Sequence, residues 1–503
     1  MSLNKIKEQK HWVILGAGPA GLTAAYELVK KGKPIILFEK REFLGGASAT
    51  LYKDGFAYDF GPHAYHIKGD KIDLLIEEMA DETLIRKNIN QKLIIEDEVI
   101  GYPLKFWELM RSIHPLHSLR MVFDYVASNI IYTFIRVPEE NFETWGIKKF
   151  GYSLYNLCFG QYSKRTWGIS PTQLSKTLAI SKLHKLNLLD IILKLFGFVG
   201  QEQVTHWKIF YYPENGIGEI WKNMNEKIQE LGGVIHVGSP IVSLQAGNNR
   251  IESITVLKDG VEIIYPIEKL ICTIPVGKLS SMVRGQNQDR FHDLGKKLKY
   301  VSLITVNLVF DTDRCQESHW VYLVDSRFRF NRLTEQKNLG KKCAPDGKTT
   351  VTLELTYYDE DDPMQFANDD FLERIALKEI DKISEVIPTI RREKHCSTEI
   401  LRMENVYPMY TIGFENILND LIREYAQLEN MILTGRHGLF LNIDMHDTME
   451  MSQKAAFYLM EGHTSSTQWY EMVKEYFSFK MPKGEETNKM NRMSEPNSFL
   501  VKK

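Results

Sequence analysis

Two histidines stand close together in the segment "GPHAYH", residues 61–66, directly after a short run of strand-forming residues. An imidazole donates or accepts a proton near neutral pH, so a histidine suits a position beside a group whose protonation changes during a reaction. Both histidines could instead be packing residues with satisfied nitrogens. From their spacing alone, the packing interpretation is favoured for both histidines.

A glycine-rich turn, "GAGPAG" at residues 16–21, lies between the strand-like "WVIL" and the helix-like "LTAAYELVKKG". In the G-x-G-x-x-G pattern the first glycine allows a tight turn, the second lets backbone approach a pyrophosphate, and the third lets helix pack on strand. The helix N-terminus then faces the phosphates. Glu39 ends the next strand, where an acidic residue accepts a hydrogen bond from a ribose hydroxyl. These features predict a dinucleotide-binding βαβ unit.

A second glycine pair follows this unit, in "LGGASAT" at residues 44–50. It would let backbone approach the cofactor a second time, as an extended dinucleotide with a bulky flavin requires. The pair therefore favours FAD over NAD.

Longer segments resemble a known family. "EKREFLGGASATLYKDGFAYDFGPHAYH" (39–66) resembles the N-terminal signature of the flavin amine-oxidase superfamily, which includes protoporphyrinogen oxidase, phytoene desaturases and UDP-galactopyranose mutase. "GPHAYH" is similar to the G-x-H-x-[FY]-H segment of the mutases, whose histidine loop lies against the flavin ring. The resemblance therefore implies that His63 acts beside the cofactor, and for His66 it leaves the two interpretations even. Further blocks look like the mutase branch and with these touch most of residues 11–460: "GYPLKF" (101–106), 141–175, "YYPENGIGEIW" (211–221), "YPMYTIG" (407–413) and 434–456.

The glycine motifs and the resemblance together imply a set of residues around FAD. Asp444 and Met445 should begin a helix whose N-terminus stabilises negative charge on the flavin. The implied cofactor-binding residues are Gly16, Gly18, Pro19, Ala20, Gly21, Glu39, Lys40, Gly45, Gly46, Ala47, Ser48, Gly61, Pro62, His63, Val242, Gly435, Arg436, Asp444 and Met445.

The substrate side centres on Arg436, which directly follows a buried strand-like run. Its planar guanidinium suits two parallel bonds to phosphate oxygens, although an ion pair with a carboxylate of the sheet is the alternative. The resemblance implies catalytic roles for His63, Arg436 and Tyr407. It implies substrate contacts for Trp167, Lys182, Tyr407, Arg436 and Asn442.

Two departures from the mutases put the substrate in doubt. Asn442 stands where the bacterial mutases carry a tyrosine, and Ser181, with Lys182 beside it, stands where a mobile-loop arginine is expected. Neither departure touches the residues that are expected to bind FAD.

The resemblance implies an FAD enzyme that acts on a nucleotide-activated sugar in glycan synthesis, in which reduced flavin attacks the anomeric carbon and displaces the nucleoside diphosphate. The first alternative is an oxidoreductase of the protoporphyrinogen oxidase, desaturase or amine oxidase type, acting on an apolar or amine substrate. The apolar segment 186–200, which we expect to be a buried or groove-lining helix, slightly favours it. The second alternative is a flavin-binding protein with a regulatory or structural role.

The predicted fold is α/β: a Rossmann-like FAD-binding domain with an inserted helical domain and an antiparallel β-sheet substrate domain. Alternating and helical patterns set the expected boundaries. The FAD-binding domain takes residues 8–100, 205–290 and 425–468, the helical domain 101–204, the substrate domain 291–424, and a flexible tail 469–503.

Composition narrows the partners. The 503 residues are 43% hydrophobic with a formal charge of −2, which is typical of a globular protein and gives no reason to expect nucleic acid. No window reaches the roughly 18 apolar residues of a membrane-spanning helix, and the polar N-terminus is no secretory signal. Five scattered cysteines without a C-x-x-C pair predict neither disulfides nor a metal site. We expect a cytoplasmic protein with a small-molecule substrate, and a homodimer is compatible with these patterns.

Overall fold

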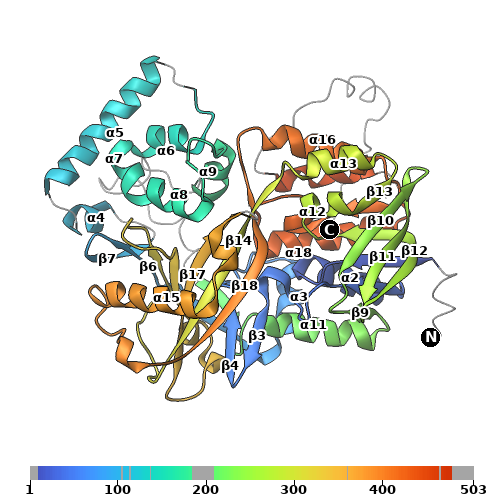
Figure 1. The fold of residues 1–503 in the computed structure, drawn as a ribbon, viewed down its shortest axis with the longest axis horizontal. Coiled ribbons are helices and arrows are strands. Elements are labelled where there is room, and N and C mark those ends of the chain that lie inside the picture. The colour runs from blue at the N-terminus through green and yellow to red at the C-terminus, as the bar shows by residue number, and fades with distance from the viewer. Residues whose placement is uncertain are drawn as a thin grey trace.

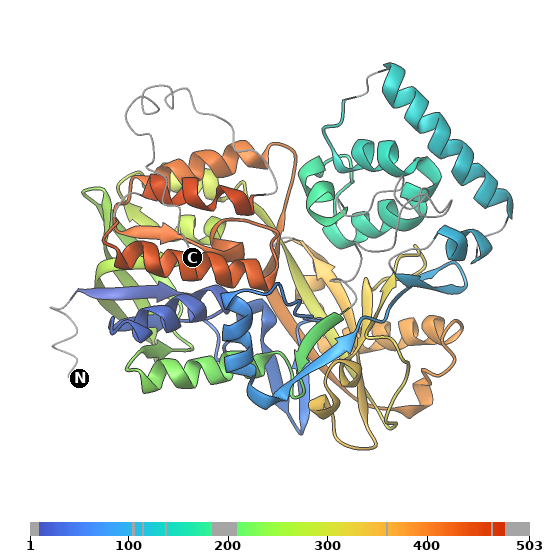
Figure 2. The same cartoon turned by 180° about the vertical axis from the view of Figure 1, so that it is seen from behind.

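The computed structural model describes residues 10–102, 106–112, 115–135, 138–183, 209–358, 361–463 and 466–477. Two large sheets lie side by side, and a group of helices stands at one end of the molecule (Figures 1 and 2). The predicted α/β class, with one mainly parallel sheet, one mainly antiparallel sheet and an inserted helical part, is confirmed.

The cofactor domain contains an eight-stranded sheet. Its strands are β1 (His11–Leu15), β2 (Ile35–Phe38), β9 (Val234–His236), β10 (Ile241–Gly247), β11 (Arg250–Lys258), β12 (Val261–Cys272), β13 (Val283–Gly285) and β19 (Met431–Leu433). The order is β13-β10-β11-β12-β1-β2-β9, and β19 also pairs with β12. The pairs β1 with β2, β1 with β12, β2 with β9 and β12 with β19 are parallel.

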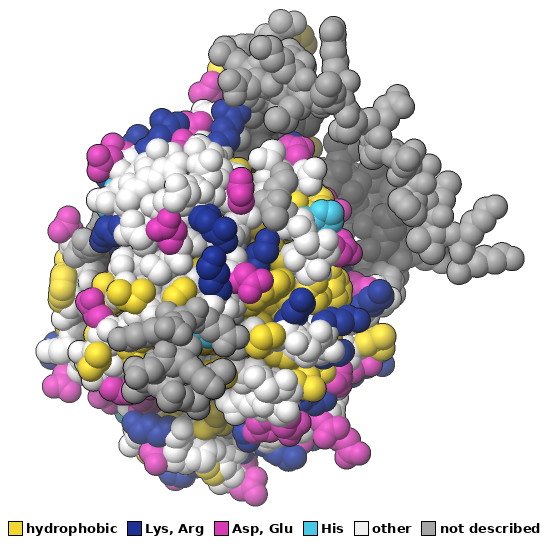
Figure 3. All heavy atoms as spheres, turned by 90° about the vertical axis from the view of Figure 1, so that its right-hand side faces the viewer, with side chains coloured by type: hydrophobic (Ala, Val, Ile, Leu, Met, Phe, Trp, Pro, Cys, Tyr) yellow, Lys and Arg dark blue, Asp and Glu magenta, His cyan; other side chains and the backbone are white. Residues whose placement is uncertain are grey.

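Helices pack around this sheet, as a parallel sheet requires because both of its faces must be covered. They are α2 (Pro19–Lys30), α3 (Lys71–Ala80), α11 (Gly218–Glu230), α12 (Val276–Met282), α13 (Gln288–Gly295), α16 (Phe414–Ala426), α17 (Gly435–Gly438), α18 (Met445–Met460) and α19 (Ser466–Met472). The α16 helix was expected in the substrate domain, but its buried face joins the core of the cofactor domain. On the side of the molecule that carries β10 to β12, acidic and basic side chains are scattered among apolar and other side chains (Figure 3).

The substrate domain contains a seven-stranded sheet in the order β18-β14-β17-β16-β15-β6-β7. The strands are β6 (Gln91–Ile95), β7 (Glu98–Tyr102), β14 (Lys299–Phe310), β15 (Trp320–Leu323), β16 (Arg332–Glu335), β17 (Thr349–Tyr357) and β18 (His395–Met409), with helices α14 (Gln336–Leu339) and α15 (Asp369–Ser384). The boundary predicted near residue 100 is therefore wrong for β6 and β7. The parallel pairing of β6 with β15 brings them into this sheet.

The inserted part of the chain is helical, as predicted. Its helices are α4 (Phe106–Ser112), α5 (Pro115–Ile135), α6 (Phe142–Phe150), α7 (Tyr152–Tyr155), α8 (Gln161–Trp167) and α9 (Lys176–Leu183). Asn141 begins α6, because its side chain accepts a hydrogen bond from the Thr144 amide at 2.8 Å. The apolar segment 186–200 lies outside the described residues. None of the described helices is long and apolar enough to cross a membrane.

Two short ribbons connect the parts: β3 (Thr50–Lys53) with β4 (Phe56–Asp59), and β5 (Leu84–Asn88) with β8 (Ile209–Pro213). At the other end of the chain, the flexible tail predicted from residue 469 begins too early. Trp469 on α19 is fully buried, and its indole nitrogen donates to the carbonyl oxygen of Leu433 at 2.8 Å. Apolar residues at helical spacing fix this segment to the core.

Candidate functional site

The turn between β1 and α2 contains three glycines under different constraints. Gly16 has a φ of +96°, which side chains disfavour. A Cβ on Gly21 would lie 1.8 Å from the carbonyl oxygen of Gly16, so only glycine lets α2 pack there. By contrast, a Cβ on Gly18 would meet only the Gly46 Cα, at 3.8 Å. The space beside Gly18 fits a ligand that approaches the backbone, as the pattern predicts.

The second glycine pair lies against this turn. The Gly45 amide donates to the Ala17 carbonyl oxygen at 2.8 Å, and a Cβ on Gly46 would lie 3.0 Å from the Gly18 Cα. The segment that follows, with Ala47 and Ser48, forms a short 3₁₀ turn. Trp221 fixes this turn, because its indole nitrogen donates to the Ser48 carbonyl oxygen at 2.9 Å. The two glycine loops therefore form one continuous cradle.

Glu39 is buried at the end of β2 and ties this strand to the glycine turn. Its Oε2 accepts from the Ala17 amide at 2.8 Å and its Oε1 from the Arg41 amide at 3.0 Å. A carboxylate offers about four acceptor positions, so Glu39 can still accept from a ribose hydroxyl. Lys40 does not face the cradle, since its Nζ pairs with Glu404 at 3.1 Å on the surface.

Two further residues were predicted to bind the cofactor: Val242, which lies near Glu39, and Gly435, which lies near the helix α2. Val242 on β10 is partly exposed and lies three residues after Ser239, whose amide donates to the Glu39 carbonyl oxygen. Gly435 has a φ of +77°, and a Cβ on it would lie 2.6 Å from the Cβ of Ala20. The α17 helix therefore meets α2 just after the glycine turn, next to Pro19.

The helix expected to begin at Asp444 and Met445 is α18. Asp444 is its N-cap residue and is exposed, and its side chain makes no capping hydrogen bond. Met445 is partly buried and packs against the main core. A Cβ on Gly435 would lie 2.6 Å from Ala20 and 3.6 Å from Thr448, so the first turn of α18 lies near the first turn of α2, where the dipole of α18 favours negative charge.

His63 lies in the loop after β4, together with Gly61 and Pro62. Gly61 has a φ of +102°, and a Cβ on it would lie 3.3 Å from both Arg332 and Glu354. Burial, and then the positive charges of Arg332 and Arg436, lower the pKa of His63 to about 4. Its Nδ1 atom is buried and has no hydrogen-bond partner among the described residues. His63 is therefore neutral near pH 7 and has a nitrogen available for a ligand.

His66 has a different environment. Its Nδ1 lies 2.9 Å from the carbonyl oxygen of Ile209 on β8. This contact holds the loop against the neighbouring ribbon and supports the packing interpretation for His66.

Arg436 lies beside a cluster of aromatic and amide side chains. Its guanidinium carbon is 5.0 Å from the centre of the Tyr407 ring, and its Nη2 donates to Asn442 Oδ1 at 3.4 Å. In the part of the chain that the structure describes, no carboxylate pairs with Arg436, and its Nε is buried without a hydrogen-bond partner. Among the described residues, Arg436 therefore does not form the ion pair with a carboxylate of the sheet that was the alternative to phosphate binding.

Trp167 completes this cluster from the helical part. Its ring lies edge-on to Tyr407, with the ring centres 6.3 Å apart. Asn442 is held from the other side, because its Nδ2 donates to the Pro408 carbonyl oxygen at 3.2 Å. Lys182 lies on α9, and its side chain is outside the described set. Three parts of the fold thus bring Trp167, Tyr407, Asn442 and Arg436 together.

Arg332 and Glu354 form a part of the site that sequence reasoning missed. They are register partners on β16 and β17, joined by two parallel bonds: Nε to Oε1 at 2.6 Å and Nη2 to Oε2 at 2.7 Å. Glu354 is almost fully buried. The sequence signal for this pair was one charged residue in each of two segments that have the alternating pattern of a strand. Their meeting depends on a strand pairing that the local pattern does not contain.

Arg165 is a second residue that was missed, and it positions Trp167. It lies two residues before Trp167 on α8, and its guanidinium donates to Asn331 Oδ1 and to the carbonyl oxygens of Asp325 and Phe328, each at 3.0 Å. These bonds fasten the end of α8 to the loop between β15 and β16.

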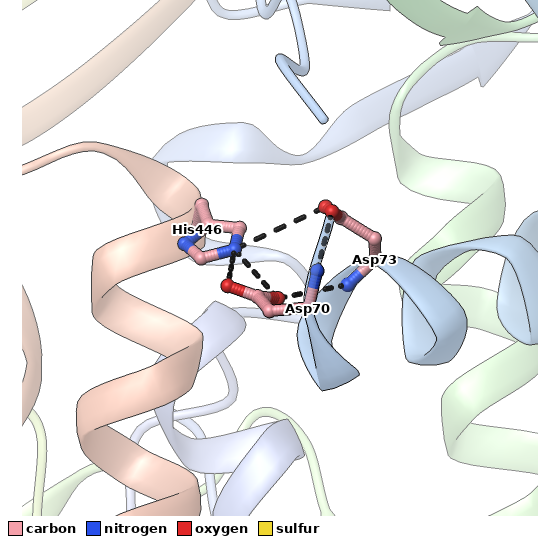
Figure 4. A group of neighbouring side chains, drawn as sticks. All are labelled: Asp70, Asp73 and His446. Carbon is pink, nitrogen blue, oxygen red and sulfur yellow. Dashed lines mark hydrogen bonds and ion pairs between the residues drawn. The ribbon is translucent and has the colours of Figure 1, made fainter. Parts of the chain in front are cut away.

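His446 on α18 faces Asp70 and Asp73 at the start of α3 (Figure 4). Its ring centre lies 6.1 Å from that of Tyr65, in the loop that contains His63. Its Nε2 lies 2.9 Å from Asp70 Oδ2, and Asp73 accepts from the amides of Lys68 and Asp70. Burial lowers the pKa of His446, but the neighbouring carboxylates of Asp447 and Asp70 outweigh it, so the net pKa is raised. The contact of His446 with Asp70 therefore fixes the start of α18 against the N-terminus of α3.

Residues 19–389 match the family described as "Flavin containing amine oxidoreductase". The chain belongs to this family. The cofactor of this amine oxidoreductase family member is FAD, and the predicted superfamily is confirmed. The residues fit the cofactor, because the cradle leaves space beside Gly18, and His63 Nδ1 and Arg436 Nε are buried without a hydrogen-bond partner among the described residues.

Two similar proteins have names that describe different activities. A Klebsiella pneumoniae protein described as "Probable UDP-galactopyranose mutase" is 22% identical over 177 residues, covering 34% of this chain and 44% of that protein. A 4,4'-diapophytoene desaturase from Methylomonas sp. is 24% identical over 290 residues, covering 50% and 52%. The matches thus span about half the length of these relatives or less.

A solved structure extends the likeness to almost the whole chain. The structure of reduced UDP-galactopyranose mutase has a TM-score of 0.76 at 19% identity and covers 94% of this chain and all of that one. At this identity the likeness concerns the fold.

Proposed function

We propose that this flavoenzyme acts on a nucleotide-activated sugar in glycan biosynthesis, through reduced FAD and without net consumption of electrons. The observation that carries the proposal is Arg436, a partly buried guanidinium without a carboxylate partner among the described residues. Such a cation needs an anion, and its planar geometry matches two oxygens of a diphosphate. Its place between the cradle and the Trp167–Tyr407 pair suits a ligand that reaches both cofactor and aromatic rings.

The neighbouring residues would orient this ligand. Tyr407 and Trp167 offer aromatic surface on one side of Arg436, and Asn442 offers an amide on the other. The Arg332–Glu354 pair adds no net charge, so within the described part of this cluster Arg436 is the cation that can compensate a diphosphate. A fixed positive charge beside a departing diphosphate stabilises the charge that develops as its bond to the sugar breaks.

FAD, when bound and reduced, would supply the nucleophile for the sugar carbon. The chain's share is to position the substrate and to hold protons. His63 is neutral near pH 7, so its buried Nδ1 can accept a proton or donate one according to the tautomer. The buried setting of His63 excludes water from that nitrogen.

The match to a carotenoid desaturase supports a second candidate, an FAD-dependent oxidoreductase with an apolar substrate. In that case the aromatic pair of Trp167 and Tyr407 would contact hydrocarbon, and Arg436 would bind the cofactor or a polar end of the substrate. The two candidates differ in their need for an electron acceptor.

One anaerobic experiment separates them. The holoenzyme is reduced with dithionite, incubated with a panel of nucleotide sugars, and the products are separated by chromatography. The proposal expects many turnovers per flavin with no further reductant consumed. Stoichiometric bleaching of the oxidised enzyme by an apolar or amine substrate, with no reaction of the reduced enzyme towards any nucleotide sugar, would establish the oxidoreductase instead.

A further inference from the structure

The strand β18, on which Tyr407 lies, forms the edge of the substrate sheet on the side nearest the cofactor domain (Figure 1). Within the described part of the chain, β18 pairs with β14 alone. The backbone groups on its outer side therefore need hydrogen-bond partners other than a neighbouring strand.

Two side chains supply such partners directly before and directly after Tyr407. His437 Nε2 lies 3.1 Å from the carbonyl oxygen of Val406, and Asn442 Nδ2 donates to the carbonyl oxygen of Pro408 at 3.2 Å. Successive residues of a strand alternate in direction, so these two carbonyl groups leave β18 on the same side. We call His437 and Asn442 the β18 clamp.

The clamp joins two domains at the anion site. Its residues flank Arg436 in the segment after β19 of the cofactor sheet, whereas Tyr407 belongs to the substrate sheet. Asn442 Oδ1 also accepts from Arg436 Nη2 at 3.4 Å, and the guanidinium carbon is 5.0 Å from the centre of the Tyr407 ring. The clamp therefore holds Arg436 and Tyr407 in one relative position.

The segment between the two clamp residues has a constrained shape. The Leu441 amide donates to the Arg436 carbonyl oxygen at 2.7 Å. Phe440 has a φ of +56° and is buried, and its ring centre lies 5.1 Å from that of Tyr300. A side chain in this left-handed region costs conformational energy and persists where its surroundings hold it, which is common at functional sites.

The strand β18 is also irregular directly before Tyr407. Where β14 has one residue, Ser302, β18 has the three residues 404–406. Asn405 in this bulge has a φ of +56°, and its amide donates to Ser302 Oγ at 3.1 Å. A β-bulge changes the direction of the side chain that follows it. Because His437 bonds to the last residue of the bulge, it fixes the direction of Tyr407.

The charge state of His437 suits this contact. Burial, and then the positive charge of Arg436, lower the pKa of His437 to about 4. The imidazole is therefore neutral near pH 7 and adds no charge beside Arg436. Since a carbonyl oxygen only accepts, the hydrogen of the neutral ring lies on Nε2.

We propose that His437 and Asn442 are positioning residues, which hold Tyr407 against Arg436 and thereby prepare the site for a diphosphate. The proposal rests on the proposed function, in which Arg436 binds this group. Side chains that are already in place lose less conformational freedom when the ligand binds, so the affinity is higher.

Isothermal titration of UDP into the oxidised holoenzyme tests the clamp through binding. His437→Leu and Asn442→Leu each remove one hydrogen bond, so the dissociation constant should rise about two- to tenfold with FAD content unchanged. His437→Gln keeps an N–H donor and should restore most of the affinity. In an Arg436→Ala background, His437→Leu should have no further effect, because the arginine that the clamp positions is gone. An undiminished effect in that background would overturn the proposal.

A measurement without ligand separates failure of the clamp from failure of the proposed function. In holoenzyme with 3-fluorotyrosine at position 407, the fluorine NMR resonance reports the position of this ring beside Arg436. His437→Leu and Asn442→Leu should shift or broaden the resonance, and His437→Gln should restore it. An unchanged resonance in both leucine variants would contradict the clamp.

His292→Leu is the matched control for this measurement. His292 Nε2 lies 3.1 Å from the carbonyl oxygen of Val283, so it makes the same kind of contact on α13, outside the site. Its loss should leave both the resonance and the affinity for UDP unchanged. A wild type that binds no UDP, but whose resonance responds to the clamp variants as expected, would refute the diphosphate role of Arg436 and support the clamp.

Discussion

Replacing Arg436 by alanine should weaken the binding of a nucleoside diphosphate and leave FAD in place. No carboxylate pairs with this guanidinium in the described parts of the chain, so its removal strands no buried counter-charge. The lost contact is a hydrogen bond to a charged group, which contributes about 1.5–3 kcal/mol. Since about 1.4 kcal/mol corresponds to a tenfold change, the dissociation constant of UDP should rise roughly ten- to a hundredfold.

Isothermal titration of UDP into the oxidised holoenzyme measures this change, and flavin absorbance reports FAD content in the same sample. Arg436→Lys keeps the charge but loses the two parallel donors, so its affinity should fall between wild type and alanine. Arg402→Ala is the matched control. Arg402 lies on the same strand as Tyr407 but donates to Asp369 at 2.6 Å on the surface, so its loss should leave UDP binding unchanged.

A different result would refute the reasoning. If Arg436→Ala released FAD while UDP affinity stayed at the wild-type value, the arginine would belong to the cofactor cradle. The anion site would then have to be sought elsewhere in the substrate domain.

Three further outcomes follow from the same geometry. The Gly18→Val variant should fold normally but purify without yellow colour, because the new side chain enters space that only a ligand needs. The Gly21→Val variant should instead have a lower melting temperature, because its side chain clashes with the carbonyl oxygen of Gly16. The unfolded chain protonates His63 below its ordinary pKa of 6.5 and the folded chain only below about 4. The free energy of unfolding should therefore fall by about 3 kcal/mol for this group as the pH drops from 6.5 to about 4. Denaturant titrations of His63→Gln should show a smaller fall over the same pH range. Glu354→Gln removes the counter-charge of the buried Arg332 and should cost about 3–5 kcal/mol in denaturant unfolding.

Local patterns in the sequence predicted the cofactor side of the molecule well. The glycine turn, Glu39 at the end of β2 and the start of α18 at Met445 all depend on residues close together in the chain, where period and turn chemistry decide the structure. The grouping of Trp167, Tyr407 and Arg436 was reached through the family resemblance, since nothing in their spacing brings them together.

What the sequence did not show depends on pairing between distant segments. The Arg332–Glu354 pair requires β16 and β17 to adopt one particular register. The sequence pattern assigned residues 91–102 to the cofactor and helical parts, because the predicted boundary between these parts falls within this range. In the structure β6 instead pairs with β15, which lies more than two hundred residues further along the chain. Lys40 was expected near the cofactor from its place in a motif, but its direction is set by Glu404 on another domain.

The closing of the cradle by the last part of the chain has a consequence for biosynthesis. The β19 strand completes the sheet beside β12, Gly435 packs on α2, and His446 fastens α18 to α3. A ribosome makes these segments after every other part of the site, so the nascent chain carries a glycine turn without the elements that enclose it. We therefore expect a nascent chain to retain FAD only after residue 446 has been made. Chains that stop earlier should remain colourless and open to proteolysis.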